Sequence, residues 1–573
     1  MSAGLFGFFI KDKKIGQIAS LYPEFDSVFH EKFLAHNVVG GKMLNALNKD
    51  RFFIEQDGIT IAFDGINLTE NISDSNDFFQ QYRQNGVDFV KQLKGVFVGF
   101  ILDEHQEKLY IFSDNLATKS LYYYYHPEFG FAFSSSLQVL TKAFRQNQVS
   151  YTLNTDAVYM MALYGMVLDN QTYVSEIAKL PYSSILEYDI KQQRLQLEQY
   201  HQYHSKKSDI SYDKAIDKIE ILLGGAIQKN WAKSKTYSDQ YFTLLSGGMD
   251  ARVNALVAKE LGYKNIKSLT FGQSGSKDVL YAEQIAKGEG FDHKSILLDG
   301  GDYLIDNIFE NYIIPNDGMI FFNGSAHMSS SLKQEDLSAF PIIHSGQIGD
   351  VLFGAFVAEN FDFKENKSSL GYTGFVRQKD LLDKIESLDS ILEKYRQRGY
   401  EMYIYEQRQI HATIYGDRSI AAYKDTISPF YDKELIQFCM SLPNAYKKNQ
   451  IIYFDWLKKY HPQVVQYPWD KINMNPDKHW KIKYGKLFKK YFNGAKKYFH
   501  WHYESMNPYG IWLKENPKII AHLDQILQEE LSRKFWSDEM KNDLKKIYAD
   551  DIFEFRNKFA VITVLLAIRL HFE

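Results

Sequence analysis

The chain has 573 residues, of which 45% are hydrophobic and 24% are charged, and its formal net charge is −4. This is an ordinary globular composition in a chain too long for one compact core, so we expect two or three domains. The near-neutral charge offers no global basic field for nucleic acid, and the single cysteine, Cys439, excludes an intramolecular disulfide framework and suits a reducing cytosol.

No segment is predicted to enter a membrane. The N-terminus lacks the basic and apolar regions of a signal peptide. The longest apolar run, Phe559 to Ile568, is interrupted by Thr563 and reaches roughly half of the ~20 residues that span a bilayer, which favours a buried C-terminal helix. We therefore expect a cytoplasmic protein without a transmembrane segment.

Residues 1–200 are predicted to be rich in β-strands. Short runs of β-branched and aromatic residues are separated by turn sequences such as Asp57-Gly58. Strands are predicted at 5–10, 59–63, 96–102, 108–112 and 121–125, and helices at about 76–94 and 154–166. This mixture indicates an α+β domain.

The stretch from Tyr241 to Gly262 has the strongest local pattern, and an amphipathic helix is predicted before it at 212–231. Tyr241 to Leu245 has the length and composition of a buried parallel strand, Ser246-Gly247-Gly248 breaks it, and apolar residues at helical spacing follow. A strand, a glycine loop and a helix in this order place backbone N–H groups and a helix N-terminus around an anion. Asp250 can hold Mg²⁺ beside a polyphosphate. An ordinary turn without a ligand is the alternative.

These patterns resemble a known family. The sequence SGGMD at 246–250 is similar to the pyrophosphate-binding loop of the N-type ATP pyrophosphatases, and it is not a Walker loop because GxxxxGK[ST] is absent. Its context resembles the asparagine synthetase superfamily. The other segments that carry the resemblance are Phe63-Asp64-Gly65 with Asn67, Ser73-Asp74, 93–114, 121–140, 272–298, 342–356 and 417–443.

The resemblance covers roughly residues 1–475 and implies a multidomain fold that joins α+β and α/β parts. An N-terminal nucleophile-type, glutaminase-like sandwich is expected at 1–200. An adenine-nucleotide α-hydrolase-like synthetase domain with a parallel sheet is expected at 201–475, and a helical extension at 476–573. Lysine pairs alternate with aromatic residues at 488–504, which favours an exposed helical face over contact with a membrane surface or a polymer.

The glutaminase-like part departs from its family at the residues that perform the chemistry. Family glutaminases expose an N-terminal cysteine as the nucleophile, whereas Ser2 stands second in this chain and the only cysteine lies far away. Asp64 replaces the asparagine of the oxyanion hole, where a carboxylate repels the oxyanion. We expect Asp64, Gly65 and Asp74 to form a vestigial glutamine pocket. Ser2, exposed by removal of the first methionine, is the alternative nucleophile.

In the synthetase part the resemblance implies a site for ATP and Mg²⁺. Asp250 and Asp350, from two strand ends, would hold the metal ion. For Asp350 a helix N-cap is the alternative, and for Phe271 packing in the core. The residues implied to contact the nucleotide or pyrophosphate are Leu245, Ser246, Gly247, Gly248, Thr270 and Phe271 (both beside adenine), Ser345 and Gly346.

Two catalytic positions differ from the family. The glutamate that follows Ser-Gly in asparagine synthetases is Gln347 here, and a neutral amide cannot act as a general base near pH 7. The family's lysine beyond Asp432 aligns with Gln450. Lys448 or Lys447 replaces it if the loop register slips, and a solvated pair of lysines is the alternative.

The sequence thus predicts an ATP-dependent carbon–nitrogen ligase of asparagine-synthetase type. It would adenylate a small-molecule or peptide carboxylate, release pyrophosphate and transfer the acyl group to an amine, without glutaminase activity of its own. Nucleic acid is not an expected partner, and homodimerisation is left open. The alternatives are a glutamine-dependent asparagine synthetase or amidotransferase that uses Ser2, and a non-catalytic nucleotide-binding homologue, favoured by Gln347 and Gln450.

Overall fold

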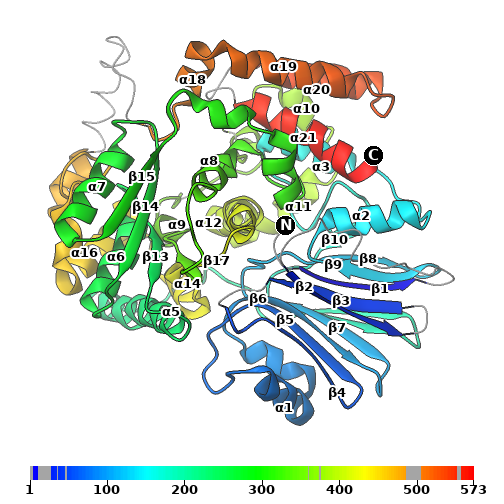
Figure 1. The fold of residues 1–573 in the computed structure, drawn as a ribbon. Coiled ribbons are helices and arrows are strands. Elements are labelled where there is room, and N and C mark those ends of the chain that lie inside the picture. Colours follow the sequence, from blue (N-terminus) through cyan, green and yellow to red (C-terminus); the bar gives the residue numbers. More distant parts are fainter. Residues whose placement is uncertain are drawn as a thin grey trace.

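The structure is a computed structural model (Figure 1). It describes residues 4–10, 27–34, 37–44, 48–358, 360–372, 374, 376–485, 505–550 and 556–573. Ser2 and the basic, aromatic stretch 488–504 lie outside the described residues.

The N-terminal part contains two six-stranded antiparallel sheets that stack face to face (Figure 1). One sheet has the strand order β10-β8-β9-β1-β3-β2 and the other β12-β11-β7-β6-β5-β4. The strands are β1 (Gly4–Ile10), β2 (Ser27–Leu34), β3 (Asn37–Leu44), β4 (Phe52–Gln56), β5 (Ile59–Asn67), β6 (Gly95–Asp103), β7 (Lys108–Ser113), β8 (Tyr122–His126), β9 (Gly130–Ser134), β10 (Ile177–Lys179), β11 (Ser184–Asp189) and β12 (Arg194–Gln199). The helices are α1 (Ser75–Asn85), η2 (Gly86–Gln92), α2 (Leu137–Gln146) and α3 (Thr155–Tyr164).

Side-chain alternation along the strands builds these layers. On β1, Leu5 and Phe9 belong to the core between the two sheets, whereas Phe6 and Phe8 belong to the large cluster on the other face. On the second sheet, Phe63 packs with Phe78 of α1 on its outer face. Helices therefore cover both outer faces, and the sandwich expected from the sequence is confirmed.

The second part is built on a parallel sheet with the order β15-β14-β13-β16-β17. Its strands are β13 (Tyr241–Leu244), β14 (Ile266–Gly272), β15 (Asp292–Leu297), β16 (Ile342–His344) and β17 (Asp425–Ile427). The sheet grows outward in both directions from its first strand, so the connections leave from opposite sides at β13 and β16. In open α/β sheets the carboxyl ends of strands at such a switch point border a crevice for ligands.

Helices cover both faces of this sheet, with α6 and α7 on one side and α8 on the other (Figure 1). The helices of this part are α4 (Tyr212–Ile219), η3 (Glu220–Gly224), α5 (Gly225–Lys235), α6 (Met249–Glu260), α7 (Lys277–Glu289), η4 (Asp299–Ile305), η5 (Phe309–Ile313), η6 (Ile314–Asn316), α8 (Asn323–Leu332), α9 (Gly349–Leu352), η7 (Lys367–Ser369), α10 (Lys379–Leu382), α11 (Leu388–Arg398), α12 (Tyr400–Tyr403), η8 (Ile404–Thr413), α13 (Asp417–Ala421), η9 (Pro429–Tyr431), α14 (Lys433–Ser441), α15 (Asn444–Lys447), η10 (Lys448–Gln450), α16 (Ile451–Tyr460) and η11 (Pro462–Gln466).

The C-terminal part is helical, with α18 (Tyr509–Glu515), α19 (Pro517–Leu531), α20 (Asp538–Tyr548) and α21 (Arg556–Phe572). The apolar run 559–568 forms the centre of α21 and is buried throughout. This confirms the predicted buried helix. Within the described ranges, no helix is both long enough and apolar enough to cross a bilayer.

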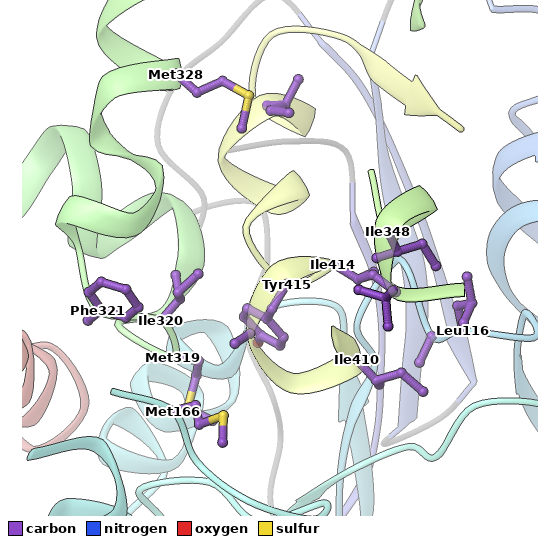
Figure 2. Packing of buried hydrophobic residues seen from close by; sticks show 14 of the residues in the cluster. Leu116, Met166, Met319, Ile320, Phe321, Met328, Ile348, Ile410, Ile414 and Tyr415 are labelled. Atoms are coloured by element: carbon purple, nitrogen blue, oxygen red, sulfur yellow. The ribbon is translucent and has the colours of Figure 1, made fainter. Parts of the chain in front are cut away.

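A continuous apolar core joins the two halves. Figure 2 shows buried side chains from both of them in one cluster, with Leu116 and Met166 from the N-terminal half and Ile348, Ile410 and Tyr415 from the C-terminal half. Helix η8 therefore packs at the junction. The domain boundaries expected at residues 200 and 475 stay predictions.

Candidate active site

A cavity of about 460 Å³ opens at the carboxyl ends of β13, β14 and β16. It therefore lies at the switch point of the parallel sheet. Of the residues assigned from the sequence, it brings together Leu245, Ser246, Gly248, Asp250, Thr270, Phe271, Ser345, Gly346, Gln347, Asp350 and Gln450.

The first wall is the loop between β13 and α6. Ser246 Oγ accepts the N–H of Gly248 at 3.1 Å and so closes the turn ahead of the helix N-terminus. Gly247 does not line the cavity, because its backbone packs against Lys277 and its carbonyl accepts Nη2 of the buried Arg252 at 3.0 Å. Arg252 also donates to the carbonyl of Pro468 at 2.6 Å. This arginine fixes the loop to the segment that follows η11.

The second wall is the loop between β16 and α9, which packs directly on the first. A Cβ on Gly346 would lie 2.2 Å from the backbone nitrogen of Ala251, and one on Gly349 would lie 2.4 Å from Cγ of Asp250. Only glycine permits this approach. The N–H of Asp350 then donates to Asp250 Oδ2 at 2.7 Å. The two loops form one unit.

Asp350 does not cap a helix. The N-cap position of α9 is occupied by Ile348, and Asp350 lies within the first turn. The N-cap alternative for Asp350 is therefore wrong. The hydroxyl of Ser345, which also lines the cavity, is buried and has no hydrogen-bond partner among the described residues. An oxygen-rich ligand in the cavity would supply one.

The electrostatics of the paired loops favour a bound cation. Burial first, and then the neighbouring carboxylate of Asp350, raise the pKa of Asp250 to about 7. Lys471 Nζ lies 3.1 Å from Asp350 Oδ2, and Tyr453 donates its hydroxyl to Asp250 Oδ1 at 3.1 Å. Burial opposes charge on Lys471, but Asp350 and Asp250 together raise its pKa.

The carboxylates fit a metal ion that is coordinated partly by the protein and partly by a substrate. The described residues contain no group of three or more His, Cys, Asp or Glu side chains that could hold a metal alone. Two carboxylates at adjoining strand ends suit Mg²⁺, which keeps several waters and takes phosphate oxygens as further ligands. Asp250 and Asp350 are the residues that would hold it.

The opposite wall is apolar and aromatic. Phe271 lies 5.3 Å from the ring of His327 between ring centroids, and burial lowers the pKa of His327 to about 4, so the imidazole is neutral near pH 7. Met506, from beyond the synthetase-like part, also reaches this wall, and its carbonyl accepts the N–H of Gln273 at 2.8 Å. A flat, uncharged base fits such a surface.

The lysines named from the sequence lie elsewhere. Lys448 is exposed and does not line the cavity. Lys447 is buried, forms an ion pair with Glu401 and donates to the carbonyl of Cys439. Sequence reasoning missed Lys471, Arg252 and Arg408. Arg408 lines the cavity with its guanidinium over the rings of Phe356 and Tyr372, at 5.3 and 5.1 Å.

The residues expected to form a vestigial glutamine pocket do not gather at one place, and Asp64 belongs to a buried ion cluster. Asp64 lies 2.8 Å from Arg51 Nε and 3.2 Å from Lys119 Nζ, and both cations also contact Asp425 of β17, at 2.6 and 3.0 Å. The carbonyl of Gly65 accepts Nδ2 of Asn48 at 2.8 Å. Asp74 is not part of this cluster. It is exposed and caps α1 by accepting the N–H groups of Asn76 and Asp77.

The single cysteine is unsuited to nucleophilic chemistry. Cys439 is fully buried in α14, and burial raises the pKa of its thiol to about 12. A thiol that stays protonated near pH 7 is a poor nucleophile.

The fold and site together define a class of protein: a glutaminase-like sandwich joined to a parallel-sheet domain with two paired glycine loops at its switch point. Family models agree with both parts. Residues 66–201 match the glutamine amidotransferase domain, and residues 233–492 match asparagine synthase. The chain belongs to the asparagine synthetase superfamily.

Curated relatives are distant. A probable glutamine-hydrolysing asparagine synthetase of Acanthamoeba polyphaga mimivirus is 24% identical over 66% of this chain and 62% of the relative. Two putative asparagine synthetases of Methanocaldococcus jannaschii are 23% and 22% identical, over 56% and 63% of this chain. The matches span only 62%, 58% and 58% of the relatives' own lengths.

Some solved structures are also similar to parts of this chain. Glutamine phosphoribosylpyrophosphate amidotransferase from B. subtilis is 12% identical over 45% of this chain and 51% of its own, with a TM-score of 0.20. An NH3-dependent NAD synthetase from Campylobacter jejuni is 15% identical over 34% of this chain and 90% of its own, with a TM-score of 0.19. These scores add nothing to the family assignment.

Proposed function

We propose that the protein is an ATP-dependent ligase that adenylates a substrate carboxylate, releases pyrophosphate and transfers the acyl group to an amine. Family membership supports ATP-dependent amidation chemistry. The observation that carries the finer proposal is the joined pair Asp250 and Asp350, which face one cavity with Lys471 beside them.

Each wall of the cavity has a part in this reaction. The N–H groups at the start of α6 and the hydroxyl of Ser246 bind the leaving pyrophosphate. Ser345 and Gly346 contact the AMP portion, and Thr270 and Phe271 contact adenine. Asp250 and Asp350 would hold Mg²⁺, and the ion would supply positive charge that neutralises the phosphates. Lys471 stabilises the negative charge that develops on the α-phosphate during carboxylate attack and amine transfer.

The amine enters without glutamine hydrolysis in this proposal. Asp64 stands where the resemblance expects an amide donor, and its side chain pairs with Arg51 and Lys119 instead of donating to an oxyanion. The buried thiol of Cys439 lies in the synthetase half. The nitrogen source is therefore free ammonia or an amine of a substrate.

A second candidate is a nucleotide-binding homologue without ligase activity. It is favoured by the neutral amides of Gln347 and Gln450, which line the cavity where a base and a cation are expected from the family. Lys471 favours the ligase, because it supplies a cation at the carboxylate pair from another segment.

Carboxylate-dependent exchange of labelled pyrophosphate into ATP tests the proposal. Wild-type protein is expected to catalyse exchange with at least one member of a panel of amino-acid and peptide carboxylates, and Asp250→Asn and Asp350→Asn to lose it. Asp57→Asn, at an exposed residue of a surface ion pair, is the matched control. ATP binding without exchange for any carboxylate would instead support the non-catalytic homologue, and glutamate release from glutamine would contradict the absence of glutaminase activity.

A further inference from the structure

A second cavity, of about 390 Å³, lies at the junction of the two halves. Its wall combines residues of the sandwich, such as Lys179 and Tyr182, with residues of the helical part, such as Arg398 and Glu406. The volume is that of a site for a small metabolite. It shares no residue with the catalytic cavity or with the ion cluster around Asp64.

Helix η8 separates this cavity from the catalytic one. Residues 406, 407, 410 and 411 line the junction cavity, whereas residues 408, 409 and 413 of the same helix line the catalytic cavity. The ten residues of η8 form a π-helix, a rare geometry that is frequent at functional sites. The two cavities therefore lie back to back across one helix.

The acidic residues of the junction cavity are already neutralised. Glu406 binds Arg398 at 2.6 Å and accepts the hydroxyls of Tyr182 at 2.7 Å and Tyr395 at 3.0 Å. Asp169 pairs with Lys394 at 2.6 Å. Neither carboxylate thus needs a further cation.

Lys179 is different, because its amine forms no hydrogen bond or ion pair with a carboxylate among the described residues. It ends β10, is 2% exposed, and its Nζ has no hydrogen-bond partner among the described residues. The centroid of the Tyr415 ring lies 4.6 Å from Nζ. Burial first, and then Arg418, lower the pKa of Lys179 to about 7, although the carboxylate of Asp114 opposes this shift. A buried amine without an acceptor is costly and is expected to be relieved by a ligand.

We infer that the junction cavity is a second ligand site, which binds a small organic carboxylate through the ammonium group of Lys179. One amine without a hydrogen-bond partner matches one carboxylate, since a dianion would leave a buried surplus charge. The apolar side chains of Leu180, Pro181 and Ile410 in the same wall suit the carbon body of such a ligand.

Calorimetric titration of the full chain with propionate, benzoate and L-glutamate, each against inorganic phosphate at equal ionic strength, tests the inference. At least one carboxylate is expected to bind wild type. Lys179→Met is expected to weaken that binding by about ten- to hundredfold, the value of one hydrogen bond to a charged group. Lys142→Met, at a half-buried lysine of α2 outside the cavity, is the matched control.

Two further measurements decide in which cavity the carboxylate binds and whether the Lys179→Met variant is folded. Without ligand, Lys179→Met is expected to unfold at a higher temperature than wild type, because it removes the unpaired buried amine. Arg408→Met removes the cation on the catalytic side of η8. Carboxylate binding that is lost in Arg408→Met and retained in Lys179→Met would overturn the inference, as would an absence of carboxylate binding or equal binding of phosphate.

Discussion

Arg51 Nη2 lies 2.6 Å from Oδ1 of Asp425, a residue 374 positions further along the chain. Both side chains are at most 3% exposed. Lys119 and Asp64 complete the cluster, so two cations and two carboxylates neutralise one another between the halves. Burial opposes charge on Asp425, but Arg51 and Lys119 lower its pKa well below the ordinary value. This carboxylate therefore stabilises the fold above the pKa that it has when unfolded, and the contribution is lost only in strong acid.

Asp425→Asn is expected to destabilise the protein by about 3–5 kcal/mol, because Arg51 and Lys119 would face only one carboxylate in a buried site. Urea unfolding followed by circular dichroism measures this. Arg83→Met is the control: the pair of Arg83 with Asp57 is more than half exposed, and its loss costs about 0–1 kcal/mol. Equal midpoints for Asp425→Asn and wild type would contradict the assigned role of the cluster.

The close contact of the two glycine loops makes a second prediction. In Gly349→Ala the new Cβ would collide with the carboxyl group of Asp250 and push the loops apart. We expect pyrophosphate exchange to fall by at least about tenfold while the chain stays folded, since small displacements at a reacting centre are costly. The exchange assay and circular dichroism report the two effects separately.

Gly225→Ala is the matched control. Nothing lies within 4 Å of a Cβ at Gly225, and its φ of −62° is helical. This substitution is expected to leave exchange unchanged and to stabilise the fold by about 0.4–1 kcal/mol. If both alanine variants exchange pyrophosphate at the wild-type rate, the contact between the loops has no catalytic importance.

Local patterns predicted the glycine loop between β13 and α6 and its flanking elements. Strand β13 and helix α6 follow directly from the apolar run, the glycine break and the helical spacing at 241–262. The strand β11 was missed because it has only six residues, so its alternation of apolar and polar side chains is brief. The edge strand β12 was missed because it is mostly polar.

The site residues that were not predicted from the sequence were missed for a different reason. Lys471 lies 121 residues from Asp350, and Arg51 lies 374 residues from Asp425, so no local spacing relates either pair. Strict alignment with the family puts its lysine at Gln450, and a slip of the loop register would bring Lys447 or Lys448 there instead. In the sequence, Lys471 is simply a lysine that follows Trp469 and Asp470. In the structure it lies in a turn that is closed by the bridge between Trp469 and Met474. Such a signal becomes specific only when the fold brings it to the carboxylates.

Protonation of Asp250 makes a third prediction. The pKa of about 7 exceeds the ordinary value of 3.8, so the native state keeps a proton that the unfolded state releases between these pH values. This group therefore destabilises the ligand-free fold increasingly as pH rises towards 7. Mg²⁺-pyrophosphate needs the ionised carboxylate, so its affinity should rise over the same interval and level off above about pH 7.

Calorimetric titration of Mg²⁺-pyrophosphate at several pH values measures this effect. Asp250→Asn is titrated alongside, because the ligand's own protonation contributes equally to both curves. The difference between the two curves is expected to grow with pH up to about 7. Thermal unfolding alone would not isolate Asp250, since burial also raises the pKa of Asp417 to about 7. A difference that is independent of pH would contradict the raised pKa of Asp250.

The last prediction separates the two lysines that could supply the catalytic cation. Lys471→Met is expected to lower kcat for pyrophosphate release by about 10²–10³, because it removes a donor positioned at the reacting charge. Lys448→Met, at an exposed residue outside the cavity, is expected to have no effect. Loss of Lys471 also removes the cation that lowers the pKa of Asp250, so the pH profile of the residual activity should move to higher pH. If Lys471 had a purely structural role, Lys471→Met would reduce the amount of folded protein without shifting that pH profile. Full activity of Lys471→Met together with a defect in Lys448→Met would contradict the prediction and assign the catalytic cation to the loop at 447–450.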